Sequence, residues 1–147
     1  MWMNKATDKT TVWTLIPNQY ERQIYLVLSS ESFYDVIKIL NDKYGFDWIE
    51  GTDFNKNDDH KAPITVINGD GFKLAIILDK FTGDYKDYSV LAHEIYHVMT
   101  NIAKETGADM NDDTSEHWAY FLSFYMDCCS QCLLETQKKK KIPKANK

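Results

Sequence analysis

The side chains with the clearest capacity for chemistry lie in the segment LAHEIYHVMT, residues 91–100. It contains two histidines four residues apart, His93 and His97, and Glu94 follows the first of them directly. With 4 histidines in a chain of 147 residues, this pattern is expected by chance only about 0.005 times. Imidazole nitrogens are common zinc ligands, and a carboxylate beside a metal can act as a general base. The segment therefore predicts a zinc site with Glu94 as the base that takes a proton from metal-bound water.

A helix would position these side chains. The pattern predicts one from about Ser89 to Thr106, with Gly107 as its stop signal. Residues four apart on a helix lie on one face, with Cβ atoms about 5–6 Å apart, so both imidazoles could reach one ion. The alternative is a helix that carries two histidines for packing or solubility. The expected apolar face consists of Leu91, Ile95, Val98 and Ile102.

A catalytic zinc usually has a third protein ligand and one open position. The spacing from His97 alone leaves several downstream candidates open. They are Asp109, Asp112, Asp113, Glu116 and His117.

The histidine motif, followed after eighteen residues by Glu116 near the start of a second helix, resembles the gluzincin metallopeptidases. This resemblance implies that His93, His97 and Glu116 bind zinc and that Glu94 activates water. The segment SEHWAYFLSFYM is similar to small metallopeptidases of bacteriophages and bacterial mobile elements. The resemblance covers roughly residues 63–134, and it implies a zincin-like fold with an edge strand just before the active-site helix.

Glu116 also has a purely structural interpretation, because Asp113 and Glu116 have the spacing of a helix capping box. Familiar gluzincins often carry an acid one turn after the ligand glutamate, whereas this chain has Tyr120 there. The side chain that would stabilise a transition state stays open among four candidates. They are Tyr85, Tyr88, His117 and Tyr120.

The rest of the chain predicts the elements around this helix. Residues 11–16 and 22–29 are expected to be strands on either side of a Pro17-Asn18 turn, and apolar residues from Phe33 to Tyr44 indicate a helix that Gly45 ends. Residues 63–68 and 72–78 are expected to form a hairpin, and a last helix should run from about Asp113 to Gln137. We therefore expect an α+β fold that forms a zincin-like single domain over residues 1–137. In this domain a small mixed sheet should pack on the active-site helix, and the helix that carries Glu116 should follow in the chain.

Residues 45–62 are irregular and acidic, and Asp53, Asn55, Asn57 and Asp59 alternate as calcium-loop ligands do. The required loop glycine is replaced by Asp58 and the required terminal acid by Ile64, so we expect an exposed polar loop. Cys128, Cys129 and Cys132 cluster in one apolar run and have no partners elsewhere, which predicts buried free thiols in a reducing compartment.

Charge is divided unevenly along the chain. Residues 138–147 contain six lysines and no acid, and we expect a disordered tail there. Residues 1–137 contain 11 basic and 22 acidic side chains, so nucleic acid is not an expected partner. From the sequence we expect neither a secretory signal peptide nor a membrane-spanning stretch. The expected location is the cytoplasm, or the host cytoplasm or virion if a phage encodes the chain.

Two functions follow from these patterns. The first is a zinc-dependent hydrolase, a metallopeptidase whose peptide or protein substrate lies extended along strand 72–78 at the sheet edge. The second is a zincin-like structural or adaptor protein, for example a phage virion component, with a structural or vestigial zinc site and a protein assembly as its partner.

Overall fold

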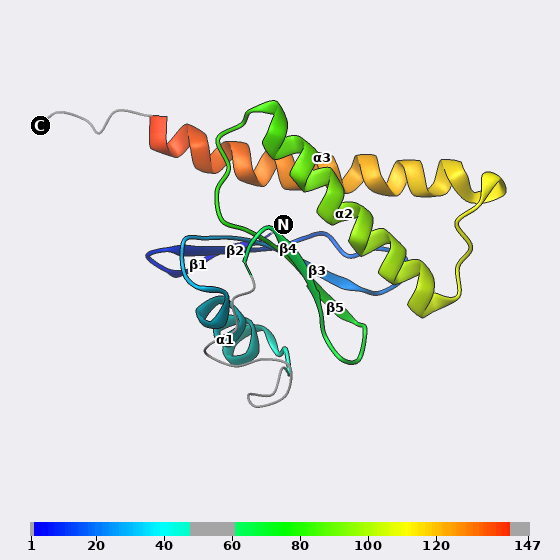
Figure 1. The fold of residues 1–147 in the computed structure, drawn as a ribbon, viewed down its shortest axis with the longest axis horizontal. Coiled ribbons are helices and arrows are strands. Elements are labelled where there is room, and N and C mark those ends of the chain that lie inside the picture. Colours follow the sequence, from blue (N-terminus) through cyan, green and yellow to red (C-terminus); the bar gives the residue numbers. More distant parts are fainter. Residues whose placement is uncertain (1, 48–60, 142–147) are drawn as a thin grey trace, which may run out of the picture.

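A computed structural model describes residues 2–47 and 61–141, apart from the side chains of residues 139–141. These residues form a mixed α/β domain with a five-stranded sheet (Figure 1). The elements in chain order are β1 (Trp2–Thr7), β2 (Thr10–Thr14), β3 (Gln23–Ser29), α1 (Phe33–Tyr44), β4 (Ile64–Ile67), β5 (Lys73–Leu78), α2 (Tyr85–Thr106), a 3₁₀ turn (Asp112–Thr114) and α3 (Ser115–Lys141). The expected combination of one mixed sheet with helices is confirmed.

The strands lie in the order β1-β2-β3-β5-β4. The β3–β5 pair is parallel and the other pairs are antiparallel. The expectation that strand 72–78 forms the sheet edge is wrong, because β5 has β3 on one side and β4 on the other. The strand at the sheet edge beside α2 is β4.

Helices cover both faces of the sheet (Figure 1): α1 packs on one face, and α2 and α3 pack on the other. Side chains of β5 alternate between the two cores, with Leu74, Ile76 and Leu78 toward α2 and α3, and Ala75 and Ile77 toward α1. A strand buried on both faces carries a continuous apolar run. This explains the segment KLAIIL.

Two predicted features are confirmed closely. Helix α1 spans Phe33–Tyr44, with Ser32 as its N-cap and Gly45 in the left-handed conformation (φ 73°) at its end. A residue without a Cβ atom adopts this conformation at no steric cost. Strands β4 and β5 form the expected antiparallel hairpin around Asn68-Gly69-Asp70-Gly71.

The strand β1 has no counterpart in the sequence analysis. Its residues, WMNKAT, show no apolar alternation, and Trp2 is 80% exposed. An edge strand can pair through its backbone without burying its side chains, so the hydrophobic pattern gives no signal for it.

The helix α2 begins at Tyr85 rather than at Ser89. The Asp84 carboxylate accepts hydrogen bonds from the backbone N–H groups of Lys86 and Asp87, so the helix has an N-cap one turn earlier than its apolar face indicated.

The turn before α3 corrects the proposed capping box. Asn111 accepts from the backbone N–H of Thr114, and the Thr114 hydroxyl accepts from the Asn111 N–H. The pair Asp113 and Glu116 therefore does not form the box. Helix α3 also continues past Gln137 to Lys141, so residues 138–141 are helical rather than disordered, and the remainder of the expected tail lies outside the described residues.

The three cysteines are buried and are not joined in disulfides, as predicted. Burial raises the pKa of Cys129 well above its ordinary value and that of Cys132 to about 11. The calcium-like residues Asp53, Asn55, Asn57 and Asp59 lie outside the described residues. Across residues 2–47 and 61–141, no helix is long and apolar enough to cross a membrane.

Candidate metal centre

Helix α2 presents its two histidines on the side opposite its core face. Leu91, Ile95 and Ile102 are at most 1% exposed, whereas His93 and His97 are exposed. At about 100° per residue, the histidines lie roughly half a turn away from this buried face. The core thus fixes the helix and leaves both imidazoles open to solvent.

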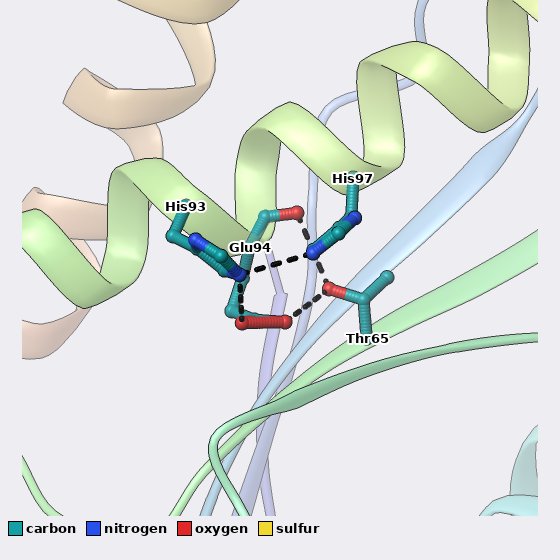
Figure 2. A network of polar contacts seen from close by, with 4 residues as sticks. All are labelled: Thr65, His93, Glu94 and His97. Atoms are coloured by element: carbon teal, nitrogen blue, oxygen red, sulfur yellow. Dashed lines mark hydrogen bonds and ion pairs between the residues drawn. The ribbon is translucent and has the colours of Figure 1, made fainter.

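The two imidazoles lie close together. The Nε2 atoms of His93 and His97 are 3.0 Å apart (Figure 2). Two nitrogen ligands of one tetrahedral zinc ion, each about 2.0–2.1 Å from it, would be about 3.3 Å apart. The separation of the two Nε2 atoms is therefore close to that of two ligands of one zinc ion.

Glu94 is buried beside the pair, with only 4% of its surface exposed. Its Oε1 atom accepts a hydrogen bond of 2.9 Å from the Thr65 hydroxyl, and its Oε2 atom lies 4.0 Å from Nε2 of His93 (Figure 2). A buried carboxylate needs such a donor, because burial without a partner is costly. The Thr65 bond orients the carboxylate, with its other oxygen toward His93.

A hollow of about 270 Å³ lies over these side chains. It is bounded on one side by α2 and on the other by the edge strand β4 and the residues just before it. Its lining consists of Pro63, Ile64, Thr65, His93, Glu94, His97 and Asn101.

Sequence reasoning missed Thr65 and Asn101. The period-two pattern of β4 carried a signal for Thr65, because Ile64 and Val66 face the α1 core and the residue between them must face α2. Helical spacing carried one for Asn101, which follows His97 by one turn and donates a hydrogen bond of 2.8 Å to its backbone carbonyl. Neither residue type signals metal binding by itself.

Glu116 lies elsewhere. It is exposed on the first turn of α3, and α3 contributes Trp118 and Phe121 to the core on the buried side of α2. Within residues 2–47 and 61–138, no three His, Cys, Asp or Glu side chains form a group that could hold a metal ion. The structure thus brings His93, His97 and Glu94 together but not Glu116, whose role as third ligand stays a prediction.

The candidates for a transition-state donor do not line this hollow. Tyr85 and Tyr120 are 76% and 71% exposed, Tyr88 packs edge-on against Phe81, and the His117 Nε2 atom lies 2.6 Å from the Tyr20 hydroxyl.

Comparisons with protein-family models, with curated proteins and with solved structures found no match to this chain.

Proposed function

We propose that this chain is a zinc-dependent hydrolase that cleaves peptide bonds. The observation that carries the proposal is the 3.0 Å approach of the two imidazole Nε2 atoms beside a buried glutamate. A hydrogen bond between the imidazoles accounts for their approach, and their position next to an oriented carboxylate is the arrangement that a metal site with a general base requires. The resemblance of the motif to gluzincins supports the same interpretation.

His93 and His97 would hold the metal through their Nε2 atoms. Bound zinc would lower the pKa of a water molecule toward about 7 and polarise a substrate carbonyl. Each histidine must then be deprotonated at Nε2, so metal binding competes with the hydrogen bond that the pair now shares. Glu116 is proposed as the third ligand on the motif resemblance alone.

Glu94 would be the general base. Its Oε2 atom is on the side of the carboxylate nearest His93, and its Oε1 atom is occupied by Thr65. In this role Oε2 accepts the proton of the attacking water and later gives it to the leaving nitrogen. The Thr65 bond keeps the carboxylate from rotating between these two steps.

The substrate would lie along β4. In the described part of the chain, strand β4 is one of the two edge strands of the sheet, and it contributes Ile64 and Thr65 to the lining of the hollow. An extended peptide could add to such an edge through main-chain hydrogen bonds. Its scissile bond would then pass above the histidine pair.

The experiment is to compare zinc content and peptide hydrolysis in the wild type and in Glu94→Gln. We expect the variant to keep zinc and to lose nearly all turnover on an unstructured peptide. The matched control is Glu105→Gln, which changes an exposed glutamate on the same helix and should keep both properties. Equal turnover in Glu94→Gln and the wild type would remove Glu94 as the base. A wild type that binds zinc and cleaves nothing would favour the structural or adaptor function instead.

A further inference from the structure

Helix α3 carries an exposed stripe along most of its length. The spacing of its members alternates between four and three residues, which is the spacing of the a and d positions of a coiled coil. All of them are exposed. They are Tyr120, Phe124, Asp127, Gln131, Leu134 and Lys138.

Three positions of the stripe carry large apolar side chains, although the solvent-exposed face of a helix is usually polar. Tyr120, Phe124 and Leu134 are 71%, 42% and 36% exposed. The opposite face of α3 already contacts the domain core, through Trp118 and Cys129 among others. The core contacts therefore do not account for the apolar residues of the stripe.

Charge is separated along the same helix. Asp112, Asp113 and Glu116 lie at its start, and Lys138 is the first of four consecutive lysines at its end. Two such helices side by side in parallel would place like charges together. In an antiparallel pair the acidic start of each helix would face the basic end of the other, and the helix dipoles would also oppose each other favourably.

One antiparallel register satisfies the whole stripe. It pairs Phe124 with Leu134, Asp127 with Gln131, and Tyr120 with Lys138, because these three pairs share position 129 as their midpoint. The first pair is apolar, the second joins a carboxylate to an amide donor, and the third places an ammonium group near an aromatic ring. A parallel pair would instead oppose Asp127 to Asp127 and Lys138 to Lys138.

From this self-complementarity we propose that the stripe is the interface of a homodimer, in which α3 of a second copy packs antiparallel on α3. A hollow of about 220 Å³ flanks the stripe beside Tyr120 and Phe124, which leaves room for a side chain of the partner. Because the interface is narrow and partly polar, we expect a dissociation constant on the order of 10–100 µM that rises with salt. The proposal does not rest on the candidate zinc ligands His93 and His97, which lie on α2.

The test is disulfide formation between copies under oxidised glutathione. Phe124→Cys and Leu134→Cys chains are prepared separately and then mixed, with the wild type as a control for the buried native thiols. We expect a covalent dimer in the mixture. Neither variant alone should link, since two copies of position 124 would be about 15 Å apart in this register, beyond the reach of a disulfide.

Sedimentation of the unmodified proteins provides the second readout. Phe124→Lys should weaken dimerisation at least tenfold, and Tyr96→Lys, which changes an exposed aromatic residue on α2, should leave it unchanged. A wild type that stays monomeric above the expected range overturns the proposal, including the case in which the stripe binds a different protein. Crosslinking of Phe124→Cys alone to the same extent as the mixture, or a dimer whose mixed sample does not crosslink, overturns this register.

Discussion

The contact between Thr65 and Glu94 gives a prediction whose size can be derived from the structure. Thr65→Val removes the hydroxyl and keeps the shape of the side chain. The Glu94 carboxylate, 4% exposed, would lose its 2.9 Å donor. A lost hydrogen bond to a buried charged group costs about 1.5–3 kcal/mol. For a domain of this size that free energy corresponds to a fall in melting temperature of roughly 3–12 °C.

The assay is urea unfolding, extended to a double-mutant cycle. Thr65→Val should lower the free energy of unfolding by the amount given above, with an unchanged dependence on urea concentration. In a Glu94→Leu background the Thr65 hydroxyl keeps only its 3.2 Å hydrogen bond to the backbone carbonyl of residue 94, so the same substitution should cost less, about 0.5–1.5 kcal/mol.

The cycle separates the contact from the general effect of a β4 substitution. Additive costs in the two backgrounds would refute the reasoning, since they would mean that the Thr65 hydroxyl does not stabilise the Glu94 carboxylate. If the metal centre is catalytic, Thr65→Val should also lower turnover more than it lowers zinc content, because the base would lose its orientation.

Three further predictions concern stability. Leu133→Ala should cost about 2–5 kcal/mol in urea unfolding, because Leu133 is 0% exposed. Burial alone would raise the pKa of Asp87, but hydrogen bonds from the Thr82 hydroxyl and from the Thr82 and Gly83 backbone N–H groups outweigh it and lower the pKa below 3.8. The stabilising contribution of Asp87 to the folded state is therefore present above pH 3.8 and is lost as the pH falls through the pKa of the folded state. Asp87→Asn should flatten this part of an acid-unfolding curve. Burial raises the pKa of Cys132 from 9.0 to about 11. As the pH rises, the unfolded chain loses the Cys132 proton before the folded chain does, so the free energy of unfolding should fall between these two pH values. The fall should be smaller in Cys132→Ala.

The sequence predicted those elements whose local signals agreed with their packing. The extent of α1 follows from the helical spacing of its apolar residues and from Gly45, and the β4–β5 hairpin follows from its glycine-rich turn. Strand β1 was missed because its side chains are exposed and the pairing lies in the backbone. The sheet edge was assigned to β5 instead of β4 because both strands are apolar, so their composition does not tell which one is central. The order of the strands depends on the crossover from β3 through α1, which residue patterns do not reveal.

The site could be predicted only as far as one helix extends. His93, Glu94 and His97 lie within a single turn of α2, so their proximity follows from helical geometry. The contributions of Thr65 and the position of Glu116 depend on how β4 and α3 pack around α2, and residue spacing does not encode that packing. The eighteen residues between His97 and Glu116 fix a sequence separation and leave the direction of α3 free.

The central claim is that His93 and His97 bind a metal ion, and the zinc content of purified protein tests it most directly. Wild type, His97→Ala, Glu116→Ala and the control Glu105→Ala, which changes an exposed residue on α2, would be prepared without added metal. We predict one zinc ion per chain in the wild type and the control and its loss in His97→Ala. The Glu116→Ala result decides the third ligand, since retained zinc would assign it to another residue. Wild-type protein without zinc, or equal zinc in His97→Ala, would contradict the claim.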